Sequence, residues 1–132
     1  MFQAMTFRTT KELNKEECDT LLEKKDIDSK ELELLLDARE VKNTSFNLVD
    51  VRELIEYRGA RITNVDYLIP TTSFYEHLKQ IEDQKETPTI VYCHVGQRSA
   101  YCQKVMKEMG FAKVINLSNG IAAYQGDITY AP

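Results

Sequence analysis

The sequence predicts one α/β domain built on a central parallel sheet of five strands, with helices on both faces. Short apolar, β-branched segments alternate with longer helical segments from Ile27 to Gln125, and this alternation is typical of parallel sheets covered by helices. The length of 132 residues suits a single core. Internal repeats and low-complexity segments are absent from the sequence.

The first 25 residues differ from the rest because they are polar and charged. Thr9 and Glu12 have the spacing of a capping box, so we expect a helix over about residues 10–24. We interpret residues 1–25 as a helical N-terminal extension and residues 26–132 as the domain. A short extended segment at Ile27 opens the domain, and a second capping-box pair, Asp28 and Glu31, precedes the next helix.

Four apolar segments are too short for helices and are expected to be the remaining strands. They are FNLVDV (46–51), VDYLIP (65–70), TIVY (89–92) and KVINL (113–117). Four helical segments follow these strands: RELIEYRG, which ends near Gly59; FYEHLKQIE, capped by Ser73 and Glu76; Ser99 to Met109; and Gly120 to Gln125.

The composition excludes several classes of function. The net charge is −4 and no run of Lys or Arg occurs, whereas nucleic-acid binding needs a basic face. No stretch approaches the roughly 20 apolar residues of a membrane span, and the N-terminus lacks the apolar segment of a secretory signal. We therefore expect a cytoplasmic protein with neither nucleic acid nor membrane as its partner.

The three cysteines form no CxxC pair, and an odd number argues against a disulfide framework. With only His77 and His94 as histidines, a zinc site has no support. We expect no metal and no cofactor. The cysteines are then free thiols, and one of them is a candidate nucleophile.

The loop after TIVY carries the strongest functional signal. It consists of Cys93, His94, Val95, Gly96, Gln97 and Arg98, and it leads into a helix at Ser99. A loop that wraps around one point turns its N–H groups inward and binds an anion. The helix dipole and an arginine would add positive charge and lower the pKa of the cysteine thiol. The pattern predicts an anion cup with a nucleophilic Cys93 at its base.

Other interpretations of these residues compete with this one. Cysteine is often buried only to fill space, but the glycine, arginine and helix start after Cys93 favour a reactive role. Cys102 shares a helical face with apolar residues and is expected in the core. We expect Cys18 to be semi-exposed and His77 to be at the surface. His94 either tunes the charge of the cup or is only solvated.

Three motifs together resemble the rhodanese-like sulfurtransferases. The loop of the single-domain members, CxxGxR[ST], is similar to CHVGQRS after TIVY. Their first signature is similar to FNLVDVRELIEYRGARITNVDYLIP, and their closing pattern is similar to VINLSNGIAAYQG. The likeness covers about residues 27–126. It implies a rhodanese-like fold and sulfur transfer without a cofactor.

The resemblance also implies roles for individual residues. Cys93 would take a sulfane sulfur from thiosulfate or a persulfide donor and pass it to cyanide, a thiol or a protein acceptor. N–H groups from His94 to Ser99 would stabilise the persulfide. Asp50 would accept hydrogen bonds from the loop, and Arg52 would lie near the cup and meet an anionic donor. Two alternatives stay open: Asp50 and Arg52 form an ordinary surface ion pair, or Asp50 pairs with Arg98.

Two alternative functions are considered. Cysteine-dependent phosphatases and arsenate reductases resemble Cys-x5-Arg, but only four residues separate Cys93 from Arg98. The narrower loop suits a terminal sulfur atom better than a tetrahedral oxyanion. A non-catalytic rhodanese-like module that binds a partner is the other alternative, and the presence of Cys93 argues against it.

Overall fold

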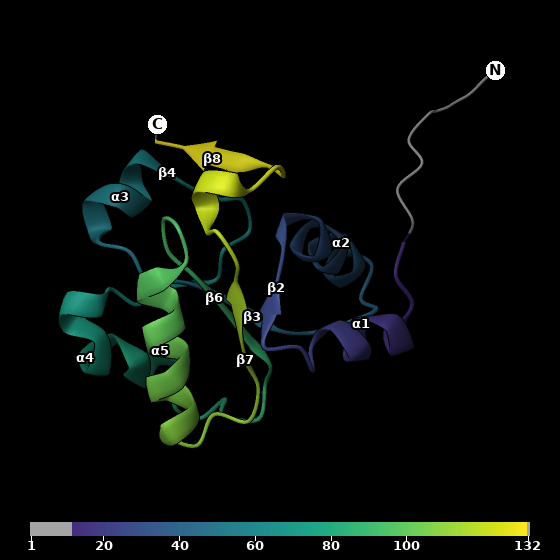
Figure 1. The fold of residues 1–132 in the computed structure, drawn as a ribbon, viewed down its shortest axis with the longest axis horizontal. Helices are drawn as coiled ribbons and strands as arrows, with labels where there is room; N and C mark the ends of the chain where they lie inside the picture. The colour runs from purple at the N-terminus through teal and green to yellow at the C-terminus, as the bar shows by residue number, and fades with distance from the viewer. Residues whose placement is uncertain (1–11, 132) are drawn as a thin grey trace.

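The computed structural model describes residues 12–131. Its main sheet has five strands in the order β2-β7-β6-β3-β5, and every neighbouring pair is parallel (Figure 1). The predicted α/β fold is therefore confirmed. The strands are β2 (Asp26–Ile27), β3 (Asn47–Asp50), β5 (Tyr67–Leu68), β6 (Thr89–Tyr92) and β7 (Val114–Leu117).

Helices cover both faces of the sheet, as predicted. Side chains of α1 and α2 pack with Leu48 and Ile90 on one face. Side chains of α4 and α5 pack with Val49 and Val91 on the other face. Because successive strand residues point to opposite faces, the apolar TIVY segment contributes to both cores. The helices are α1 (Lys15–Leu21), α2 (Ser29–Glu40), α3 (Leu54–Gly59), α4 (Phe74–Leu78) and α5 (Gln97–Glu108).

Helix α1 begins at Lys15, later than the expected start near residue 10. Its capping box uses Asn14 and Glu17: the Asn14 side chain accepts the Glu17 N–H at 2.8 Å, and the Glu17 carboxylate accepts the Asn14 N–H at 3.0 Å. Thr9, the expected cap, lies outside the described residues. Its expected partner Glu12 precedes the helix.

Helix α1 packs onto the domain core. Leu13, Cys18 and Leu22 belong to the same buried cluster as Leu32 and Leu35 of α2. The expectation that Cys18 is semi-exposed is therefore wrong, because α1 lies against α2 and its inner face is fully covered. Burial raises the pKa of the Cys18 thiol. The division at residue 25 stays a prediction.

A two-stranded antiparallel ribbon was not predicted. It pairs β4 (Ala60–Ile62) with β8 (Ile128–Tyr130), with Ala60 opposite Tyr130. Each strand has only three residues and its partner is distant in sequence, so no local pattern indicates the pairing. Three short 3-10 turns complete the structure, and they are η1 (Thr71–Ser73), η2 (Lys79–Ile81) and η3 (Ile121–Ala123).

Candidate active site

Cys93, the candidate nucleophile, directly follows β6, at the side of the sheet where the parallel strands have their carboxyl ends. β3 and β6 end side by side, with Asp50 opposite Tyr92, and Cys93 is the next residue. The loop then turns into α5 near α3 (Figure 1). Ligands of open α/β sheets bind at this side. The structure therefore brings Cys93 and Asp50 to the carboxyl-terminal side of the sheet, as the strand pattern predicts.

The sulfur of Cys93 is surrounded by hydrogen-bond donors. It accepts the backbone N–H of Gly96 at 3.1 Å and the Ser99 hydroxyl at 3.3 Å. Burial raises the pKa of this thiol, but hydrogen bonds from the Ser99 hydroxyl and from the N–H groups of Ser99, Gly96 and Arg98 outweigh that effect. The pKa of Cys93 therefore lies below its usual value, which favours the nucleophilic thiolate.

Gly96 allows the loop to close around the sulfur. Its φ of 106° lies in the left-handed region, and its carbonyl accepts the first helical hydrogen bond, from Ala100 N–H at 3.2 Å. α5 consequently begins at Gln97, two residues before the expected start at Ser99. Ser99 does not cap the helix because its hydroxyl is directed at Cys93 Sγ and at the Gly96 carbonyl.

The segment after β7 supports the loop from behind. Ile121 N–H donates to the Cys93 carbonyl and Ala122 N–H to the His94 carbonyl, both at 2.9 Å. Between them and β7 lies Gly120, with φ 61°. A Cβ on Gly120 would lie 2.6 Å from the Cys93 carbonyl oxygen and closer still to that of His94. Only glycine fits at this position without displacing the loop.

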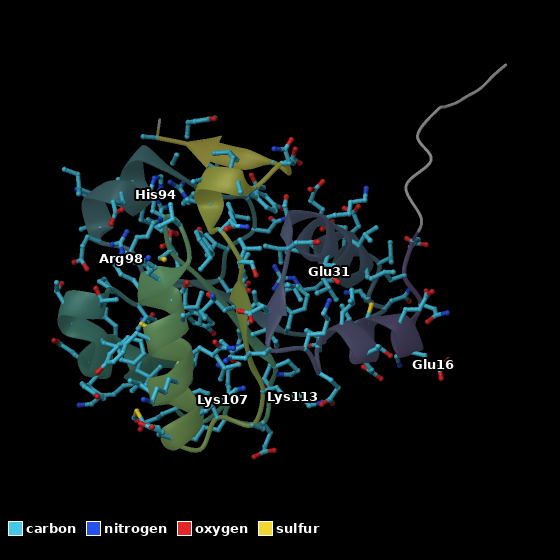
Figure 2. The ribbon with its side chains drawn as sticks, viewed as in Figure 1. Glu16, Glu31, His94, Arg98, Lys107 and Lys113 are labelled. Atoms are coloured by element: carbon cyan, nitrogen blue, oxygen red, sulfur yellow. The ribbon has the colours of Figure 1, made fainter. Side chains whose placement is uncertain are left out.

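Arg98 forms a two-pronged ion pair with Glu56 of α3. Its Nη1 lies 2.9 Å from Oε1 and its Nη2 lies 3.0 Å from Oε2. The hydrogen bonds from Arg98 hold the pKa of Glu56 at about 2. The alternative in which Arg98 pairs with Asp50 is wrong, because α3 brings Glu56 to the guanidinium. Figure 2 shows Arg98 and His94 at the α3 end of the molecule.

Asp50 pairs with Arg52 and not with the loop. The carboxylate of Asp50 accepts the backbone N–H of Arg52 at 2.8 Å and its Nη2 at 2.8 Å. The Arg52 guanidinium also donates to the Ala60 carbonyl at 2.6 Å and lies 5.7 Å from the ring of Tyr92. The expectation that Asp50 accepts loop hydrogen bonds is wrong. This buried pair instead fixes the chain between β3 and β4.

The remaining candidate side chains lie in several environments. His94 and Val95 are exposed on the loop, and Gln97 is exposed at the start of α5. Cys102 is buried in the core cluster of α4 and α5, as predicted, and burial raises its pKa to about 12. His77 is only half-exposed, since its Nδ1 lies 3.0 Å from the carbonyl of Ser73.

Three residues of the site were not identified from the sequence: Glu56, Asn116 and Gly120. Asn116 Nδ2 donates to the Gly96 carbonyl at 3.2 Å, and its Oδ1 is buried without a hydrogen-bond partner. The glycine after Asn119 and the glutamate before Tyr57 stand within the family signatures. The signatures therefore contain both residues, but they do not indicate that Gly120 contacts the Cys93 loop or that Glu56 pairs with Arg98.

Among residues 12–131, no cluster of three His, Cys, Asp or Glu side chains is arranged to hold a metal. Over the same residues, no helix combines the length and hydropathy that a membrane span requires. A hollow of about 580 Å³ lies between α2 and the segment before β8, and its lining includes Glu33, Asp37 and Tyr124. None of its lining residues belongs to the Cys93 loop, so the chemistry of Cys93 does not use it.

Comparison with known proteins gives one consistent result. The sequence pattern that describes the Rhodanese-like domain matches residues 15–127. A relative from Bacillus subtilis, "Putative sulfur carrier protein YrkF", is 35% identical over 82 residues, which are 62% of this chain and 43% of that protein. The matches span about half the length of the curated relatives.

Solved structures agree on the fold. The Rhodanese-like Domain Protein from Staphylococcus aureus is 26% identical, with a TM-score of 0.65 over 79% of this chain and 93% of that chain. Thiosulfate sulfurtransferase from Pseudomonas aeruginosa is 18% identical, with a TM-score of 0.68 over 80% of this chain and 20% of that one. The second likeness concerns the fold alone.

Proposed function

Because the chain belongs to the Rhodanese-like domain family, we propose that it is a sulfurtransferase that carries a sulfane sulfur on Cys93 as a persulfide. The donor is thiosulfate or a persulfide, and the acceptor is cyanide, a thiol or a protein. The three cysteines of the chain are free thiols, and we propose the cytoplasm as the compartment because it keeps thiols reduced.

One observation carries the proposal: several N–H groups and a hydroxyl converge on Cys93 Sγ. Donors placed in this way stabilise a negative charge without reorganisation, as in an oxyanion hole. A persulfide also carries a negative charge, on its outer sulfur, so we expect the inward N–H groups of the loop to stabilise the product as well as the attacking thiolate.

The reaction balances without an added oxidant or reductant. The Cys93 thiolate attacks the sulfane sulfur of the donor, a new S–S bond forms, and the donor's own bond to that sulfur breaks. Its electron pair leaves with sulfite or with the donor thiolate. The Cys93 persulfide then gives its outer sulfur to the acceptor, and the Cys93 thiolate is restored.

Phosphatase chemistry is less well supported by the site. The Arg98 guanidinium, which would clamp a phosphate, is occupied by Glu56. The loop is also one residue shorter than Cys-x5-Arg. The relative from Bacillus subtilis carries the name "Putative sulfur carrier protein YrkF", and this name supports sulfur transfer over a non-catalytic module that binds a partner.

The test is intact-mass measurement after incubation of the full chain with thiosulfate and, separately, with a persulfide donor. We expect one added sulfur that cyanide removes as thiocyanate, and no hydrolysis of p-nitrophenyl phosphate. Cys93→Ser should abolish the adduct, and Cys102→Ala should retain it. If no donor loads Cys93, the chain is a binding module and this proposal is wrong.

A further inference from the structure

Both arginines beside the loop already have carboxylate partners. Arg98 is paired with Glu56, and Arg52 with Asp50. A further carboxylate, Glu53, lies one turn before Glu56 and accepts hydrogen bonds from two threonines, Thr71 and Thr72. Neither Arg98 nor Arg52 is therefore free to pair with a small oxyanion such as thiosulfate.

Exposed apolar side chains gather on the elements around the loop. Residues 12–131 expose eight large apolar side chains, and five of them are on α3, α4, the loop or the first turns of α5. Exposed apolar side chains on neighbouring elements indicate an interaction surface. We call these five the apolar rim: Leu54, Ile55, Tyr75, Val95 and Tyr101.

The elements that carry the rim are joined at the site. The Glu56–Arg98 pair ties α3 to the start of α5, and Glu53 ties α3 to the segment before α4 through Thr72. Tyr101 stands one helical turn after Arg98. Figure 1 shows α3, α4 and the start of α5 on the same side of the molecule. The rim therefore lies on the elements that surround the Cys93 loop.

We propose that the physiological sulfur partner of Cys93 is a cysteine carried by a protein with an apolar surface around that cysteine, and that Glu56 selects against small oxyanions by occupying Arg98. The proposal rests on the sulfurtransferase function above. In the transfer step the partner thiolate attacks the outer sulfur of the Cys93 persulfide, a new S–S bond forms, and the bonding pair returns to Cys93.

The first experiment uses two synthetic peptides with one central cysteine, flanked in one by Leu and Phe and in the other by Gly and Ser. Cys93 is first loaded by a persulfide donor and the loading is verified by mass. We expect the apolar peptide to accept sulfur with a kcat/KM about tenfold or more above that of the polar peptide. Absence of loading would contradict the sulfurtransferase function; loading followed by equal rates for the two peptides would overturn only this inference.

Variants of the rim residues test whether the preference for the apolar peptide depends on this surface. The double variant with Ile55→Ser and Tyr101→Ser should remove most of the difference in kcat/KM between the two peptides. The control double variant Val41→Ser and Met109→Ser changes two exposed apolar residues outside the rim and should preserve the difference between the peptides. If both pairs change the preference by the same factor, the rim is not the docking surface.

The second experiment tests the role of Glu56. Glu56→Gln frees the charge of Arg98, so kcat/KM for thiosulfate should rise several-fold, while kcat/KM for a neutral organic persulfide should change much less. Arg98→Gln in the Glu56→Gln background should cancel the gain. An unchanged or lower rate with thiosulfate in Glu56→Gln would show that Glu56 does not select against oxyanions.

Discussion

The three thiols of this chain show that burial alone does not determine cysteine reactivity. All three are buried, and burial raises the pKa of Cys18 and Cys102. Cys93 differs because the loop directs N–H groups and the Ser99 hydroxyl at its sulfur. A buried thiol becomes a nucleophile only where such donors compensate for the lost water.

Ser99→Ala should raise the pKa of Cys93, because the hydroxyl that stabilises the thiolate is removed. Alkylation by iodoacetamide requires the thiolate, so its rate against pH should shift to higher pH, and the rate at neutral pH should fall. Cys102→Ala serves as the control and should follow the wild-type curve. Superimposable curves for Ser99→Ala and wild type would contradict the role of the hydroxyl.

Gly120→Ala should disrupt the loop, since its Cβ would collide with the carbonyl oxygens of Cys93 and His94. We expect a loss of about 2 kcal/mol or more in the free energy of unfolding, with loss of persulfide formation. Gly59→Ala is the matched control because a Cβ there meets nothing within 4 Å. Denaturant unfolding measures both variants, and equal stabilities would contradict the steric argument.

The sequence correctly predicted Cys93 directly after a strand and Gly96 in the loop, because strand and loop are local patterns, whereas Arg98 lies in the first turn of α5. It did not find Glu56 as the partner of Arg98, since that contact depends on how α3 is placed against α5. The roles of Asn116 and Gly120 likewise arise from packing between segments far apart in sequence. Contacts of this kind leave no local signal.

At the scale of elements, the Glu56–Arg98 pair fastens the short helix α3 to α5. The pKa of Glu56 falls from 4.5 to about 2 on folding. A carboxyl with a lowered pKa stabilises the fold fully above its unfolded pKa, and loses this contribution as the pH falls through the folded value. The pair should thus contribute above about pH 4.5 and be lost toward pH 2.

Glu56→Gln should therefore unfold more easily than wild type above about pH 4.5, by up to about 1 kcal/mol because the pair is partly exposed. The difference should shrink as the pH falls toward 2. Thermal unfolding at a series of pH values measures it. A difference that persists undiminished at the lowest pH would mean that the glutamine weakens the helix by another route.

Helix boundaries were the least predictable feature at this scale. Ser99 has the residue type of an N-cap, but its hydroxyl is directed at the sulfur, and Gly96 is the N-cap instead. The segment expected to be one helix over 74–82 is α4 followed by the turn η2. Ends of elements depend on such competing hydrogen bonds, whereas their order along the chain follows from hydrophobic periodicity.

For the whole molecule, the sheet divides the interior into two cores, and the strand–helix alternation was enough to predict that arrangement. The same reasoning set residues 1–25 apart as an extension. Side chains of α1 share a buried cluster with α2 and the sheet, so we expect α1 and the domain to unfold together.

The last prediction tests this cooperativity. Leu22, at the end of α1, is 3% exposed and lies in the core cluster with α2. Leu22→Ala should cost about 2–4 kcal/mol and shift the whole unfolding curve, because the cavity opens in a core shared with the sheet. Asp19→Ala, an exposed change on the same helix, should cost no more than about 0.5 kcal/mol. Fluorescence and circular dichroism should report one common transition for both variants. An unchanged main transition in Leu22→Ala, with a separate early loss of helix, would show that α1 is a detachable extension.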